Sequence, residues 1–404
     1  RGVPRVAPVR AGRSVRRSGS SHAVARPRIL VVLDYYLPGV NAGGPVRSVA
    51  NLALHLAGEA DFLVITRDRD FGDARPYAGV TRDRWVSVEG AQVRYMSRRW
   101  PGSITRLVRR TPHDALYLCS YFSPSSLELL WARHAGLVRS DRFVIAPRGQ
   151  FAEAALANKA RKKAVTLRLA NATGVHRHVM WHAANDAEAS RIRAVVRPEG
   201  RVITAANLPS PSSAATRTRR KMPGRLRVVT VARVHPMKNI LESVRLLRDL
   251  DGEIEYDVIG PHEDARYLAE CREAAAALPS RVSVRFPGAM SHASLVSVLP
   301  EYDLFLLPSR TESFGHSILE ALSHGVPVLV SDRTPWRGLE RHGAGWDVPL
   351  DDAARFRQAL VACVAMDDAA FRARADAARR VAREASESTI PQTLDAYREL
   401  FLLP

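Results

Sequence analysis

Cysteine is scarce: Cys119, Cys271 and Cys363 are the three in 404 residues, and they lack the spacing of metal ligands. An odd number of scattered cysteines argues against a disulfide framework and indicates a reducing compartment, so we predict a cytoplasmic protein. The chain also lacks an apolar run of about eighteen residues, which argues against a transmembrane helix. We therefore expect any contact with the inner face of the cell membrane to be peripheral.

Acidic residues are few relative to basic ones, and the formal net charge is +19. Much of the excess lies in the first 28 residues, which contain eight arginines and no acidic residue. This stretch is rich in Ser, Ala, Pro and Gly and has no signal-peptide core, so we predict a disordered basic tail over residues 1–27. Aromatic residues interleaved with basic ones, as single-stranded nucleic acid requires for stacking, are scarce, so no nucleic-acid partner is predicted.

The folded part begins with the pattern of a parallel α/β domain. Ile29–Leu33 reads as a strand, a glycine-bearing loop follows, and a helix with an apolar face runs to Gly58. Gly43 and Gly44 in this loop let the backbone approach a ligand closely, and Arg47 supplies a cation in the first turn of the helix. The spaced glycines of a dinucleotide fingerprint are missing, so a plain turn remains an alternative.

The stretch from Asp303 to Asp332 carries the clearest chemical signal. A buried strand over Leu304–Leu307 is followed by a loop, a helix up to Gly325 and another buried strand, and ligands of such units bind at the carboxyl ends of the strands. On one helix, Glu312 and Glu320 would be about 80° out of register. We therefore place Glu312 on the loop and Glu320 in the helix, with backbone N–H groups between them for a phosphate.

Two cations are predicted at the same edge of the second sheet. The strand Leu226–Val231 ends just before Arg233 and Lys238, which with the two carboxylates suggest a site for a nucleotide sugar: hydroxyls at both ends and a diphosphate between. The alternative is that Glu312 only complements the helix dipole and that Glu320 is a solvated helix residue.

The remaining patterns are less specific. We interpret Asp68 and Asp70 as a solvated charge run, and the histidines 176, 178 and 182 as structural, so no metal site is predicted. The basic helix that contains Lys159, Lys162 and Lys163 is either a solvated face or a contact for phosphate or anionic lipid. Near the C-terminus we expect a turn over 343–346, Ala-rich helices over 352–384, and a last helix that begins at Pro391.

Four of these motifs together resemble a known family. Glu312-Ser-Phe-Gly-His-Ser-Ile-Leu-Glu320 is similar to the Glu-x7-Glu motif of the group 1, family four retaining glycosyltransferases, and Arg233 with Lys238-Asn239 resembles their phosphate-binding turn. Tyr36-Leu37-Pro38 with Gly43-Gly44, and Pro147-Arg148-Gly149 with the lysines that follow, are similar to bacterial members that build surface polysaccharides. The resemblance runs from about Arg28 to the C-terminus.

The resemblance implies a GT-B fold: two Rossmann-like α/β domains with parallel sheets that face a cleft, and a C-terminal helix that crosses back to the first domain. We accordingly predict an N-terminal acceptor domain over 28–206, a linker over 207–224, a nucleotide-sugar-binding domain over 225–384 and the crossing helix over 385–404. Many members place a histidine after the strand that ends near Ser120, and none is present there. The group that assists deprotonation of the acceptor is therefore unassigned.

By the same likeness, the protein is a retaining, metal-independent hexosyltransferase of exopolysaccharide or lipopolysaccharide synthesis. It needs no cofactor, uses a UDP- or GDP-type sugar as donor, and modifies a glycan or polyprenyl-linked acceptor. The residues implied as catalytic are Glu312, Arg233 and Lys238, and those implied as donor-binding are Glu320, Phe314, Gly315, His316, Ser317, Gly43 and Gly44. The acceptor or membrane side is assigned to Arg47, Arg148, Lys159, Lys162 and Lys163.

Two alternatives to a transferase stay open. One is a nucleotide-sugar epimerase on the same fold, which would release an epimerised sugar without any acceptor. The other, suggested by the net charge of +19, is a basic protein that binds nucleic acid or membrane.

Overall fold

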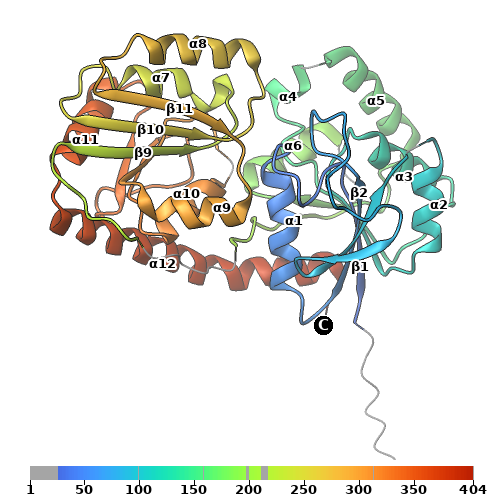
Figure 1. Cartoon of the computed structure of the whole chain (residues 1–404). Coiled ribbons are helices and arrows are strands. Elements are labelled where there is room, and N and C mark those ends of the chain that lie inside the picture. Colours follow the sequence, from blue (N-terminus) through green and yellow to red (C-terminus); the bar gives the residue numbers. More distant parts are fainter. Residues whose placement is uncertain are drawn as a thin grey trace, which may run out of the picture.

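The computed structural model describes residues 26–98, 100–157, 159–196, 200–210, 217–312 and 314–403. These residues form two α/β domains that lie side by side, and one long helix runs beneath both (Figure 1). Most of the predicted basic tail and residues 211–216 of the predicted linker lie outside the described residues. The predicted residue boundaries of the domains stay predictions.

The N-terminal domain is built on an eight-stranded sheet with the order β3-β4-β2-β1-β5-β6-β7-β8. Each neighbouring pair is parallel except β3 and β4, which form an antiparallel hairpin at one edge. The strands are β1 (Arg28–Val32), β2 (Asp61–Arg67), β3 (Trp85–Val88), β4 (Ala91–Met96), β5 (Ala115–Leu118), β6 (Arg142–Ile145), β7 (Met180–Ala183) and β8 (Val202–Thr204).

Helices cover both faces of this sheet. One face packs against α1 (Gly44–His55), and the other is covered mainly by helices that follow β4. These are α2 (Ser103–Arg110), α3 (Pro124–His134), α5 (Ala160–Thr173) and α6 (Asp186–Val196), with the short α4 (Glu153–Ala157) before α5. The central strands are buried on both faces, which explains why their sequences are apolar runs rather than alternating patterns.

The C-terminal domain has a six-stranded sheet that is parallel throughout, with the order β11-β10-β9-β12-β13-β14. Its strands are β9 (Arg225–Val231), β10 (Glu253–Ile259), β11 (Val282–Gly288), β12 (Leu304–Leu307), β13 (Val328–Ser331) and β14 (Gly345–Val348). Its helices are α7 (Ile240–Arg245), α8 (Ala265–Ala276), α9 (His292–Val298), α10 (His316–Ser323) and α11 (Ala353–Ala365), with short 3-10 helices at Pro236–Lys238 and Leu299–Glu301. α7, α8 and α11 pack on one face of the sheet, and α9 and α10 on the other.

The helix α12 (Asp368–Phe401) connects the two domains (Figure 1). Its first half packs Ala378 and Ala382 against the core of the C-terminal domain, and its end packs Tyr397 and Phe401 into the core of the N-terminal domain. The crossing helix implied by the resemblance is therefore present.

One sequence prediction in this region is wrong and another is only partly right. Pro391 does not begin a helix but lies inside α12, because packing against one core before Pro391 and another after it holds the helix continuous across the proline. The turn predicted over 343–346 is present only in its first half: Gly343 lies in a turn and its N–H donates to the carbonyl of Glu340 at 3.0 Å. Gly345 and Trp346 instead begin β14, where they pair with Val328 and Leu329.

Candidate active site

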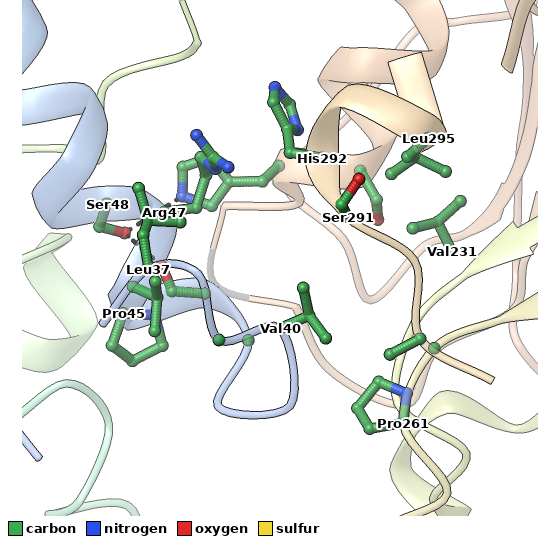
Figure 2. Close-up of a pocket in the computed structure, with 18 of the residues that line it drawn as sticks. Leu37, Val40, Pro45, Arg47, Ser48, Val231, Pro261, Ser291, His292 and Leu295 are labelled. Carbon is green, nitrogen blue, oxygen red and sulfur yellow. Dashed lines mark hydrogen bonds between the residues drawn. The ribbon is translucent and has the colours of Figure 1, made fainter. Parts of the chain in front are cut away.

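A cavity of about 820 Å³ lies between the two domains, at the carboxyl ends of both sheets. Every residue that the resemblance implied as catalytic or donor-binding lines this cavity, and so do Arg47 and Arg148. Figure 2 shows Leu37, Pro45, Arg47 and Ser48 on one side of it, and Val231, Pro261 and Leu295 on the other. The two domains together therefore form one site.

Glu312 and Lys238 face each other at the C-terminal side of the cavity. The Nζ of Lys238 lies 2.5 Å from Oε2 of Glu312, and their side chains are 15% and 19% exposed. The two loops are joined by their backbones, since the N–H of Arg310 donates to the carbonyl of Met237 at 2.9 Å. As predicted from the helical register, Glu312 lies on the loop and Glu320 in the second turn of α10.

Arg233 stands on the loop after β9 and pairs with Glu263 at 2.5 Å. Gly43, from the opposite domain, has a φ of 68°, and a Cβ built on it would lie 3.9 Å from Cδ of Arg233. The glycine loop thus brings backbone close to the cation across the cavity. Within the described residues, a Cβ on Gly44 would meet no atom within 4 Å, so there is free space beside it.

The N-terminus of α10 opens into the same space. Gly315 precedes the helix with a φ of 79°, and among the described residues no side chain caps the helix there. The indole Nε1–H of Trp336 donates to the carbonyl of Phe314 at 3.0 Å and holds this turn in place. Free N–H groups and the helix dipole make such a terminus suited to a phosphate or another anion. Ser313, which precedes this turn, lies outside the described residues.

Glu320 is largely enclosed, with a side chain that is 14% exposed, so the alternative of a solvated helix residue is wrong. Burial raises the pKa of its carboxyl to about 7, against a smaller opposing effect of Arg47. Nδ1 of His292 lies 3.6 Å from Oε1 of Glu320. Burial lowers the pKa of both His292 and His316 to about 4, so both rings are neutral at neutral pH.

The N-terminal domain contributes two polar side chains, Ser48 and Glu89, that were not predicted from the sequence. Nε2 of His316 lies 3.3 Å from Oγ of Ser48 on α1, which joins the two domains at the cavity. Arg47 pairs with Glu89 at 3.1 Å, and both residues line the cavity. Glu89 sits at the turn of the β3–β4 hairpin with a φ of 39°, an uncommon conformation for glutamate. The Glu89-Gly90 pair between two apolar strands was the signal for this turn.

The predicted acceptor-side residues divide into two groups. Arg148 lines the cavity, but its guanidinium is engaged by Asn207 at 2.6 Å and by the Tyr117 hydroxyl at 2.7 Å. The lysines do not line the cavity: Lys159 and Lys162 are exposed, and Lys163 donates to the carbonyl of Ala155 at 2.6 Å. A role for these lysines at a membrane or acceptor stays a prediction.

The interpretation of Asp68 and Asp70 as a solvated charge run is wrong. Both are buried, and Oδ2 of Asp70 accepts from the backbone N–H of Val40 at 2.6 Å and of Asn41 at 2.9 Å. These hydrogen bonds compensate the cost of burying the carboxylate and fix the glycine-bearing loop.

Two of the three clustered histidines have structural contacts. His176 lies 2.8 Å from the hydroxyl of Tyr121, and His182 lies 2.6 Å from that of Tyr117. In the described part of the chain, no group of three or more His, Cys, Asp or Glu residues is arranged to hold a metal ion. No helix there is long and apolar enough to cross a membrane.

Residues 216–379 match the model of the family described as glycosyl transferases group 1. The C-terminal domain is a group 1 glycosyltransferase domain. An 86-residue stretch of the chain is 35% identical to a phosphatidyl-myo-inositol mannosyltransferase of Mycobacterium leprae. That stretch covers 21% of this chain and 23% of the mannosyltransferase, so the chain matches about a quarter of that relative's length.

Most of the chain is similar in fold to solved structures, and this likeness shows a GT-B architecture. A sucrose-phosphate synthase from Thermosynechococcus elongatus superimposes with a TM-score of 0.65 at 17% identity, over 93% of this chain and all of that one. Anabaena Alr3699/HepE, solved in complex with UDP and glucose, superimposes with a TM-score of 0.63 at 16% sequence identity, and the match covers 92% of this chain and 100% of that one. WaaG, a glycosyltransferase involved in lipopolysaccharide biosynthesis, superimposes with a TM-score of 0.59 at 14% sequence identity, and the match covers 89% of this chain and 99% of that one.

Proposed function

We propose that the protein is a retaining glycosyltransferase that moves a sugar from a nucleotide-diphosphate sugar to an acceptor bound against the N-terminal domain. One observation carries the proposal: the paired Lys238 and Glu312 stand beside the open N-terminus of α10, in one cavity with Glu320. A cation and backbone N–H groups suit a diphosphate, and carboxylates suit sugar hydroxyls.

In this proposal each group has one task. Glu320 accepts hydrogen bonds from the donor ribose, and Glu312 with the N–H groups of Phe314, Gly315 and His316 binds the transferred sugar. Ser317 adds an N–H at the same helix end, while Lys238 and Arg233 meet the diphosphate and Gly43 and Gly44 approach it from the other domain. Glu263 and Glu312 hold the two cations before the donor arrives.

The proposed reaction retains the configuration at the anomeric carbon. The acceptor hydroxyl attacks on the face from which the diphosphate departs, so that the bond from the anomeric carbon to the phosphate oxygen breaks and the bond to the acceptor oxygen forms. The departing phosphate oxygen takes the proton of the acceptor hydroxyl, so the reaction needs no histidine after β5 as a base. Lys238, Arg233 and the helix N-terminus stabilise the charge that develops on the diphosphate, the task of a metal ion in other transferases.

The synthesis of a surface polysaccharide at the cytoplasmic side of the membrane is the setting we propose. It rests on the motifs shared with bacterial members of the family and on the similarity of fold to WaaG, a glycosyltransferase involved in lipopolysaccharide biosynthesis. The mannosyltransferase relative makes GDP-mannose a donor to test beside UDP-glucose and UDP-galactose.

The test is a transfer assay with these three donors, with and without acceptor glycosides, in the presence of EDTA. We expect release of nucleoside diphosphate that depends on the acceptor and a product of retained configuration. Lys238→Ala is expected to lose activity, whereas Arg266→Ala, a cation on α8 that is 91% exposed, is expected to keep it. Release of an epimerised free sugar without acceptor would favour an epimerase instead.

A further inference from the structure

The N-terminal side of the cavity has an aliphatic surface that the donor does not account for. On β3, Val86 and Val88 alternate with Trp85 and Ser87, so the two valines share one face of the hairpin. They lie opposite Val93 and Ala91 of β4, which are buried, but Val86 and Val88 themselves are only half-buried and line the cavity. The edge strand therefore presents branched aliphatic side chains to the site.

Other aliphatic residues continue this surface. We use the term aliphatic wall for Leu37, Pro38, Val40, Val80, Val86 and Val88, all of which line the cavity. Figure 2 shows Leu37 and Val40 on the loop that faces the C-terminal domain. Asp70 holds this loop through a hydrogen bond of 2.6 Å with the N–H of Val40, and Val80, Val86 and Val88 pack against the core of the N-terminal domain. The wall is therefore formed without a ligand.

The wall offers few polar groups to a sugar. Tyr95 borders it, but its hydroxyl donates to the carbonyl of Leu37 at 2.5 Å, and burial raises the pKa of this hydroxyl to about 12. The polar groups lie at one end instead, where Glu89 directly follows Val88 and pairs with Arg47. Ser48 and His316 meet at the same end of α1. Sugar hydroxyls left against the wall would lose their hydrogen bonds to water, whereas an aliphatic chain would gain from burial.

We infer that the acceptor carries an aliphatic chain, and that the aliphatic wall binds this chain while the acceptor sugar lies toward Glu89 and Ser48. This inference rests on the proposed function, because it takes the C-terminal half of the cavity as the donor site and the N-terminal half as the acceptor site. Of the two acceptor classes that the resemblance implied, a glycan or a polyprenyl-linked sugar, it selects a sugar joined to an alkyl or isoprenoid chain. A free hydrophilic oligosaccharide would leave the wall in contact with water.

The test measures binding by calorimetry to the full chain saturated with a nucleoside diphosphate, UDP or GDP. The probes are the methyl and n-octyl glycosides of glucose, galactose and mannose, kept below the concentration at which the octyl compounds form micelles. Each buried CH₂ strengthens binding about fourfold, so a chain with several carbons on the wall is expected to bind at least about tenfold more tightly than its methyl counterpart. In the double variant Val86→Thr/Val88→Thr this advantage is expected to fall by about tenfold.

Val165→Thr is the matched control, since Val165 is 63% exposed on α5 and does not line the cavity. It is expected to keep the octyl preference, and equal melting temperatures of the variants show that their folds are intact. Equal affinity for octyl and methyl glycosides, or a preference that survives in the double variant, overturns the inference. Failure of both nucleoside diphosphates to bind overturns the proposed function instead, and with it the assignment of the wall to an acceptor.

Discussion

Lys238 and Glu312 are 74 residues apart in the chain, yet Nζ of one lies 2.5 Å from Oε2 of the other in the interdomain cavity. The pair is mostly shielded from water, with 15% and 19% of the side chains exposed. Each group compensates the charge of the other before a donor is bound, and a diphosphate must compete with Glu312 for Lys238.

The first prediction follows from this competition. Glu312→Gln removes the negative charge and keeps the size of the side chain, so Lys238 becomes free for a diphosphate. We expect nucleoside diphosphate affinity to stay equal or to increase by a few fold, while the transfer rate falls by at least about 100-fold because the sugar loses its carboxylate. Calorimetry and initial rates on the same preparations measure the two effects. Glu270→Gln, on the outer helix α8, serves as the control, and a Glu312→Gln enzyme with full activity would remove Glu312 from the site.

The second prediction concerns the pH dependence of stability. Because the pKa of Glu320 is raised to about 7 in the fold, the folded carboxyl binds more protons than the unfolded one between about pH 4.5 and 7. Its contribution is therefore favourable at low pH, and the free energy of unfolding falls as pH rises through this range. Between about pH 4.5 and 7, the free energy of unfolding of the wild type is expected to fall by about 3 kcal/mol relative to that of Glu320→Gln.

Denaturant unfolding of both proteins at several pH values measures this difference. His292 and His316, whose pKa values are lowered to about 4, act in the opposite direction as the pH falls below 6.5, but they are present in both proteins. Their effects therefore largely cancel in the comparison. Parallel stability curves for the wild type and Glu320→Gln would show that Glu320 titrates normally.

The third prediction concerns Gly315, the residue before α10. A Cβ here would lie 2.9 Å from Cδ1 of Ile318 and 3.1 Å from Nε1 of Trp336, at a φ of 79°. Gly315→Ala is therefore expected to cost about 2 kcal/mol or more and to weaken donor binding. Gly72→Ala is the matched control: its φ is 83°, but within the described residues a Cβ there meets no atom within 4 Å, so about 1 kcal/mol is expected. Equal unfolding free energies for the two variants would contradict the role of the close packing.

The fourth prediction concerns Trp336, which lies outside every motif found in the sequence. Trp336→Phe keeps most of the ring but removes the hydrogen bond to the carbonyl of Phe314. Since this bond orients the turn whose N–H groups are proposed to meet the donor, we expect the KM for the donor to rise about three- to tenfold, with a smaller effect on kcat. Trp100→Phe, at a position that is 56% exposed, should change neither value. Equal donor KM values for wild type and Trp336→Phe would show that the indole is dispensable.

Much of the site could be predicted because its residues sit where βαβ units place ligand-binding groups. Glu312, Arg233 and Lys238 each follow a strand of one parallel sheet. Because Glu312 and Glu320 would be out of register on one helix, Glu312 was predicted on a loop and Glu320 on a helix, and the structure has them there. The sequence also predicted the strands that are buried on both faces, since apolar runs such as Leu304–Leu307 are typical of them.

The parts that sequence did not predict depend on contacts between distant segments. The burial of Asp70 is set by a loop 30 residues earlier, and Glu89 reaches Arg47 only because the hairpin lies beside α1. The local sequence also misleads at Gly345, which was predicted in a turn but begins β14, and at Pro391, where the packing of α12 on both domain cores keeps the helix continuous. In each case tertiary packing determines the local structure or burial of a residue, and the local sequence alone predicts a different one.

We propose that the interdomain cavity binds a nucleoside diphosphate through Lys238, beside the N-terminus of α10. The most direct measurement is calorimetric titration of the wild type, Lys238→Ala and Arg266→Ala with UDP and GDP in EDTA. We expect one of the two nucleotides to bind the wild type and Arg266→Ala with equal affinity, and to bind Lys238→Ala about 10- to 100-fold more weakly. Binding that is unchanged in Lys238→Ala would exclude the proposed role of Lys238, and binding that is absent from the wild type for both nucleotides would exclude the proposed donor site.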